Sequence, residues 1–173
     1  MKAMVAMLAV VTAMMWGLKR YYADAPVDDL RWMLAPTARV VTATTGVRFE
    51  RQSGEGYVSY ARRFVIAKAC AGINFMIAAF GMIAWTLRAR ARSVAAAATL
   101  VGAGFAASYA TAIVVNAARI DIALWLADQP VRLMTPSQVH RVEGITCYFI
   151  GLVLLCEALR LVDTRRRCSG TTR

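Results

Sequence analysis

A chain of 173 residues of which 59% are hydrophobic has too few polar side chains to cover a soluble domain of this size. Its formal net charge of +11 would suit a nucleic-acid-binding protein, but most basic residues stand in short clusters beside long apolar runs, as in membrane proteins. We therefore expect one all-α integral membrane domain, with about four transmembrane helices plus a short interfacial helix and no nucleic-acid partner.

The first predicted span covers residues 3–18, an apolar run that follows Lys2 and precedes Lys19. A cleaved signal peptide is the alternative, because Ala23–Ala25 has the small-x-small form of a cleavage site. Pro26 would directly follow that cut, so an uncleaved helix is the favoured interpretation.

Residues 19–63 form a polar region that we expect on the outer side of the membrane. Within it, the segment Leu30–Val47 is moderately apolar but contains Arg31 and Arg39. The segment is too short and too charged for a span, so it is predicted to be an interfacial amphipathic helix that begins near Pro36.

Three more spans are predicted over residues 64–87, 93–118 and 144–162, each a long apolar run. The basic turn at residues 88–92 and the basic tail at residues 163–173 are both typical of cytoplasmic segments. Because successive spans cross the membrane in opposite directions, the turn and the tail fall on the same side, so the two signals agree. They predict a multi-pass protein of the plasma (inner) membrane.

This orientation leaves the polar region of residues 19–63 outside, although residues 21–63 alone contain six arginines. Its length and its five acidic residues weaken that objection, because the orientation rule applies best to short loops.

Three chemically notable residues then reach the outer membrane boundary on separate helices. Cys70 lies near the outer start of the second span, Arg119 ends the third, and His140 precedes the last. A cysteine thiolate is a nucleophile, a nearby arginine favours the thiolate, and a histidine can accept and return a proton. Together they suffice for acyl transfer or peptide cleavage through a covalent intermediate, with the arginine alternatively holding the oxyanion.

Further polar residues are predicted to support this site. Asn74 stands four residues after Cys70, which would place it on the same helical face. Asn116 stands one turn before the candidate arginine, and Glu143 stands three residues after His140, where a carboxylate would orient the imidazole. The sequence contains no metal-ligating cluster and no phosphate-binding glycine loop, so no cofactor or metal is expected.

Three short motifs resemble those of the exosortase/archaeosortase family. They are Ala69–Phe75 (ACAGINF), Asn116–Ile120 (NAARI) and His140–Gly144 (HRVEG), in the family's order and at successive span ends. The resemblance covers Gly56–Leu161, and the short length points to a compact subtype such as exosortase K.

The resemblance implies a membrane-embedded cysteine transpeptidase or protease that acts outside on membrane-anchored proteins with a C-terminal sorting signal. Cys70 would form the thioacyl intermediate, and Arg119 would stabilise the thiolate or the oxyanion. His140 would act as base and acid, with Arg141 as the alternative third residue. A glycolipid or glycan would be the acceptor.

Two other classes stay open. In a non-catalytic membrane scaffold or accessory subunit, the same residues would serve helix packing and anchoring. In a small transporter, Lys68 and Asn74 would line a path, but no inverted repeat or broken helix pair supports this class.

Overall fold

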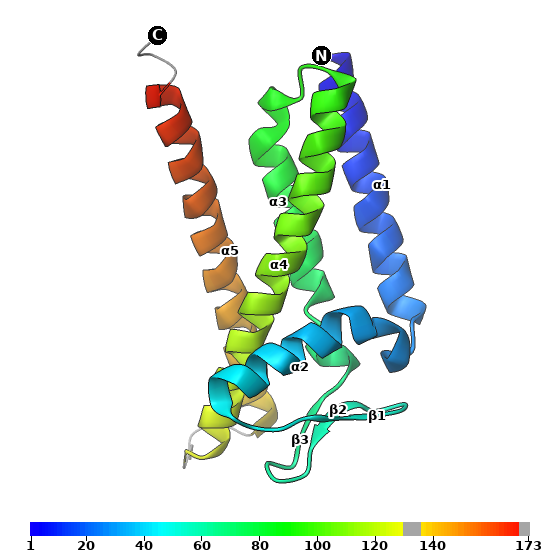
Figure 1. Ribbon diagram of the computed structural model, residues 1–173, viewed down its shortest axis with the longest axis vertical. Helices are drawn as coiled ribbons and strands as arrows, with labels where there is room; N and C mark the ends of the chain where they lie inside the picture. Colours follow the sequence, from blue (N-terminus) through cyan, green and yellow to red (C-terminus); the bar gives the residue numbers. More distant parts are fainter. Residues whose placement is uncertain (130–135, 170–173) are drawn as a thin grey trace.

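The computed structural model describes residues 1–129 and 136–169. Within the last helix, the side chains of residues 136, 137, 139, 140 and 163–169 are outside that description. Four long helices run side by side, and a shorter helix and a small sheet lie across one end of them (Figure 1). The elements are α1 Lys2–Asp24, η1 Val27–Leu30, α2 Arg31–Thr45, β1 Glu50–Gln52, β2 Gly56–Ser59, β3 Phe64–Ile66, η2 Lys68–Cys70, α3 Ile73–Leu87, η3 Arg88–Arg90, α4 Val94–Ala127 and α5 Pro136–Ser169.

The prediction of about four helices long and apolar enough to cross a membrane is confirmed. They cover Lys2–Asp24, Lys68–Arg90, Val94–Ala127 and Arg141–Val162. Helices α4 and α5 each contain 34 residues and extend beyond the predicted spans 93–118 and 144–162. At 1.5 Å per residue, each is about 50 Å long, which exceeds the hydrocarbon core of a bilayer.

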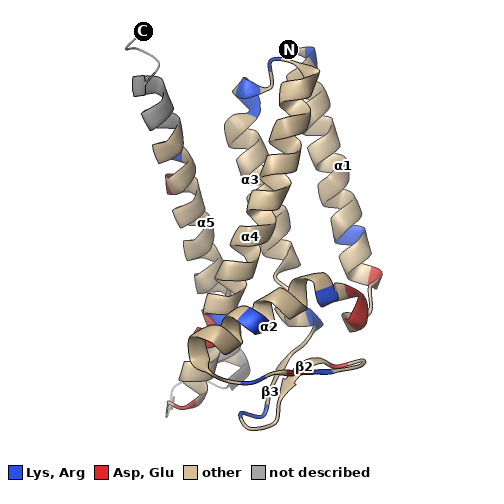
Figure 2. Cartoon of the chain, viewed as in Figure 1, with Lys and Arg blue, Asp and Glu red and all other residues tan. Residues whose placement is uncertain are grey.

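Different elements lie at the two ends of the helix bundle. The turn at η3 lies at one end, beside the start of α1; we call this the hairpin end (Figure 2). Helix α2 and the sheet lie at the opposite end, which we call the sheet end (Figure 1). Helices α3, α4 and α5 alternate in direction, as predicted for three successive spans. That the sheet end lies outside the cell stays a prediction.

The three-stranded sheet was not predicted. Strand β2 pairs antiparallel with β1 and β3, with Tyr57 opposite Ile66. Gly56 has φ +113°, and a Cβ there would lie 2.4 Å from the Ile66 carbonyl oxygen, so only glycine fits. The prediction that the second span begins at Phe64 was wrong, because residues 64–66 pair as β3 and the helix begins only at Ile73.

The interfacial helix exists as α2, but its predicted start near Pro36 was wrong, because it begins at Arg31. A proline inside a helix removes the N–H that the carbonyl four residues earlier would accept. Here that carbonyl belongs to Trp32, and it accepts a hydrogen bond of 2.8 Å from the Tyr109 hydroxyl of α4. A side chain of the bundle thus replaces the missing backbone donor, and α2 continues through the proline.

Tyr109→Phe should destabilise the protein by about 1–3 kcal/mol, because it leaves a half-buried carbonyl without its donor. The phenyl ring would keep the stacking contact with Trp32, whose ring centroid lies 5.8 Å away. Urea or thermal unfolding of the purified chain in detergent measures this effect. Tyr60→Phe is the control, since its hydroxyl bonds to Gln52 at the surface, and it should change stability by less than about 0.5 kcal/mol. Equal stability of the two variants would contradict this account of α2.

Helix α1 packs against α3 and α4 and is anchored at its C-terminal end by a lysine. The Lys68 ammonium donates hydrogen bonds to the carbonyls of Ala23 (3.0 Å) and Ala25 (2.7 Å), and it lies 5.4 Å from the Tyr22 ring centroid. A cation at the free carbonyls of a helix end is favourable. Lys68 therefore binds the C-terminal end of α1.

Candidate active site

Cys70 lies in a single 3-10 turn between strand β3 and helix α3, at the sheet end. Its backbone N–H bonds to the Ala67 carbonyl at 2.8 Å, and Gly72 then adopts φ +69° to begin α3. The residue is buried, with 6% of its surface exposed. Cys70 was expected near the outer start of the second span, and the structure places it in a turn before helix α3.

The predicted placement of Asn74 on the face of Cys70 was also wrong. The four-residue spacing applies only along a continuous helix, and Gly72 interrupts it. Asn74 is exposed, and its side-chain oxygen accepts a hydrogen bond of 2.7 Å from the Lys19 ammonium of α1. It therefore ties α3 to α1 and does not support the cysteine.

Asn116 joins the cysteine turn to the helices around it. Its side chain on α4 is fully buried, and its amide donates a short hydrogen bond to the Cys70 carbonyl. Its side-chain oxygen accepts a hydrogen bond of 2.9 Å from the Tyr148 hydroxyl on α5. A fully bonded buried amide fixes one geometry, so Asn116 holds the backbone of the turn in place.

Gly72 permits this close approach. A Cβ at Gly72 would lie 3.2 Å from both Cβ and Cγ of Asn116, and the positive φ disfavours any other residue.

Gly72→Ala should cost about 1–2 kcal/mol from the left-handed backbone alone, and it should also displace the cysteine turn through contact with Asn116. The matched control is Gly54→Ala, because Gly54 has φ +80° but nothing within 4 Å of its Cβ position. Unfolding in detergent should show the larger loss for the Gly72 variant. If the two variants lost the same stability, the contact with Asn116 would have no energetic consequence.

Arg119 is the centre of the site. It is 6% exposed on α4, and its guanidinium is close enough to the Cys70 thiol to interact with it electrostatically. Its Nη1 donates to the Tyr148 hydroxyl at 3.3 Å, and its Nε lies 3.7 Å from the Glu143 carboxylate. The structure thus brings together the predicted thiol and cation from elements that are 49 positions apart in the sequence. Arg119 does not end its helix as predicted, since α4 continues to Ala127.

Glu143 lies at the site. Its carboxylate forms a buried ion pair with Arg119, the two side chains being 4% and 7% exposed, whereas its predicted contact with His140 falls on a side chain outside the described part of the chain. The Cys147 thiol donates to the same carboxylate at 3.8 Å. Breaking a buried ion pair by removing one member leaves an uncompensated charge, so the pair fixes how α4 and α5 meet.

Sequence reasoning missed Tyr148, although a signal for it existed. Gly144, Tyr148 and Gly151 fall at spacings of four and three, which places them on one helical face. A Cβ at Gly144 would lie 3.0 Å from Arg119 Nε, and one at Gly151 would lie 2.8 Å from Val115 Cγ1. The two glycines bring α5 close to α4, and the tyrosine between them reaches the arginine.

The third catalytic candidate remains a prediction. His140 belongs to α5, but its side chain lies outside the part of the chain that the structure describes. Arg141 is exposed, whereas the neighbouring Glu143 and Gly144 are buried. Among the described residues, no group of three or more histidine, cysteine or acidic side chains is arranged to hold a metal ion.

Comparison with known proteins gives no matching family model, no matching curated protein and no matching solved structure. The resemblance to exosortases therefore rests on the three sequence motifs alone, and the chemistry must be argued from the site itself.

Proposed function

We propose that this protein is a membrane-embedded cysteine transpeptidase or protease of the exosortase type. The observation that carries the proposal is the proximity of the buried Arg119 guanidinium to the buried Cys70 thiol. Asn116 holds the backbone carbonyl of Cys70, and the arginine donates a hydrogen bond to Tyr148. A cation beside a buried thiol offsets part of the cost that burial imposes on the thiolate, which is the nucleophilic form.

The reaction would proceed in two steps. The Cys70 sulfur attacks the scissile carbonyl, the C–N bond breaks, and the departing amine takes a proton to leave a thioester on the enzyme. A hydroxyl or amine of the acceptor, or water, then attacks that thioester and loses its proton as the thiol is restored. His140 is the proposed proton carrier, with Arg141 as the alternative, and Arg119 would stabilise the thiolate or the negative oxygen of the intermediate.

The surroundings of the site suit a substrate that is itself anchored in the membrane. The cysteine turn lies at the end of four apolar helices, beside α2 and the sheet, and not in the middle of the bundle (Figure 1). A protein with a C-terminal sorting signal, including an apolar helix and a basic tail, would present its cleavage point at this level. We propose that this level is the outer face of the plasma (inner) membrane, where a glycolipid or glycan would accept the cleaved protein.

A non-catalytic scaffold is the second candidate, and one observation favours it. The interactions of Arg119 with Glu143 and Tyr148 join α4 to α5, so the arginine has a structural use without any reaction. Under this alternative, Cys70 would be a small buried apolar residue, as free cysteines often are.

The proposed function is tested on the membrane proteins of cells that produce this chain. Mass spectrometry of their C-terminal peptides should show one or more proteins that lose a C-terminal apolar segment and basic tail, and that keep both when the chain is deleted. Re-expression of the wild-type chain should restore the loss. If no C-terminus differed between the two kinds of cell, the proposed cleavage would be refuted.

A further inference from the structure

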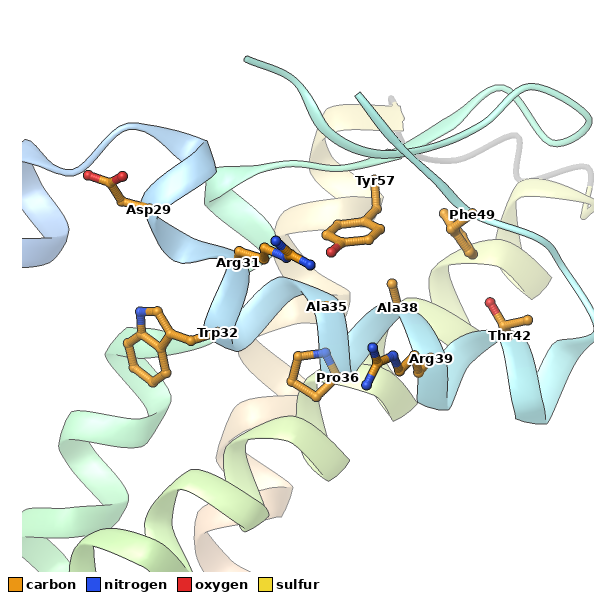
Figure 3. A pocket seen from close by; sticks show the side chains of 10 residues that line it. All are labelled: Asp29, Arg31, Trp32, Ala35, Pro36, Ala38, Arg39, Thr42, Phe49 and Tyr57. Atoms are coloured by element: carbon orange, nitrogen blue, oxygen red, sulfur yellow. The ribbon is translucent and has the colours of Figure 1, made fainter. Parts of the chain in front are cut away.

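A cleft of about 820 Å³ lies between α2 and the sheet, apart from the cysteine turn (Figure 3). Helix α2 forms one wall, and side chains that precede β1 or belong to β2 form the other. The lining residues are Asp29, Arg31, Trp32, Ala35, Pro36, Ala38, Arg39, Thr42, Phe49 and Tyr57.

The cleft carries an excess of positive charge. Arg31 and Arg39 both line it, are exposed, and form no ion pair within the described part of the chain. Figure 3 shows the two side chains on the same stretch of α2, on either side of Pro36. Eight residues of helix separate their Cα atoms by about 12 Å, which two long arginine side chains can bridge around one anion.

The nearby carboxylates do not neutralise both arginines. Asp28 is occupied by the β1–β2 hairpin: it accepts hydrogen bonds from the Gly54 backbone N–H, Arg51 and Ser53. These bonds, the one from the Gly54 N–H first, hold the pKa of Asp28 below its ordinary value. Asp29 is the one acidic residue among those that line the cleft.

The other walls suit an amphiphilic ligand at the membrane surface. Trp32 stacks on Tyr109 of the α4 span, and Phe49 and Tyr57 add two more aromatic rings. Tryptophan and arginine on a helix that lies across the ends of spans, with tyrosines beside it, are typical of the headgroup layer of a bilayer.

We propose that this cleft binds the phosphodiester headgroup of an anionic lipid from the leaflet at the sheet end. Arg31 and Arg39 hold the phosphate oxygens, for which the planar guanidinium is well suited, and the Thr42 hydroxyl donates a further hydrogen bond. Trp32 and Pro36 contact the apolar glycerol and upper chain region. The proposal rests on the membrane placement and not on the chemistry of Cys70, so the two succeed or fail separately.

The test is a titration of the full chain, purified in a non-ionic detergent, with dioctanoyl phosphatidylglycerol, followed by native mass spectrometry. Arg31→Gln/Arg39→Gln should weaken binding at least 10-fold. The matched control, Arg48→Gln/Arg63→Gln, removes two exposed arginines from the same end of the molecule and should change affinity less than 2-fold. The single Arg39→Gln variant should weaken binding at least 3-fold, and thermal unfolding checks that each variant is folded.

Two control ligands test whether the bound anion is a lipid headgroup or a free phosphate. Dioctanoyl phosphatidylcholine should bind at least 10-fold more weakly than phosphatidylglycerol, and inorganic phosphate at the same concentration should not displace the lipid. Equal losses in the two double variants would overturn the site, because bulk charge would explain them. Equal binding of phosphatidylcholine, displacement by inorganic phosphate, or binding of an acidic peptide in place of the lipid would overturn the proposed ligand.

Discussion

Cys70→Ala should abolish C-terminal processing of the substrate proteins, with a loss of at least about 10³-fold in rate, because removal of a nucleophile leaves no route to the covalent intermediate. The buried site should tolerate this small change, since alanine lacks only the sulfur. The measurement is the amount of uncleaved substrate in membranes of cells that express each variant at equal level.

Cys156→Ala is the matched control, because this cysteine lies on α5 and is partly exposed. It should process substrates as the wild type does. If Cys70→Ala processed them at more than about a tenth of the wild-type rate, the sulfur would not be the nucleophile. That result would support the non-catalytic scaffold.

Arg119→Met should have two separate effects, one on stability and one on activity. It leaves the Glu143 carboxylate buried without its ion-pair partner, which should cost about 3–5 kcal/mol. It also removes the cation beside the thiol, so processing should fall at least about 100-fold. Arg119→Lys keeps a charge but loses the planar donors that contact Tyr148 and Cys70, and its activity should fall by a similar factor.

The double variant Arg119→Met/Glu143→Gln separates the two effects. Because it removes both charges, it should recover most of the lost stability, as measured by unfolding in detergent. It should still fail to process substrates. Recovery of processing together with stability would mean that the arginine serves only to join α4 and α5.

The sequence predicted the helical part of the fold well, because long apolar runs bounded by basic residues leave few alternatives. It failed where the outcome depends on partners far away in the chain. The residues of β3 are as apolar as a span, and only their pairing with β2 makes them a strand. Likewise, Pro36 reads as the start of a helix, and only the Tyr109 hydroxyl explains why α2 begins a turn earlier.

The candidate site was predicted only in part, because some of its contacts depend on residues far apart in the chain. The proximity of Cys70 to Arg119 follows from topology, because two consecutive spans end at one level. The ion pair between Glu143 and Arg119 was not predicted, because nothing in the sequence shows how closely α5 approaches α4. Only the close approach of α5, which Gly144 permits, brings this carboxylate to the arginine.

Asn74 shows how one residue can change a site prediction. Its spacing from Cys70 would place both on one face of a helix, but the left-handed Gly72 lies between them. The same glycine packs on Asn116, which then holds the Cys70 carbonyl. The supporting amide is therefore Asn116 of α4 and not Asn74 of α3.

The most direct measurement is the mass of Cys70 itself in protein isolated from cells that contain its substrates. Peptide mapping after rapid acid quenching should show a fraction of Cys70 carrying a polypeptide in thioester linkage. Hydroxylamine should release that polypeptide, and Cys147 and Cys156 should carry none. An unmodified Cys70 in protein from cells that are actively cleaving substrates, or an adduct that persists in Cys70→Ala, would contradict the proposed mechanism.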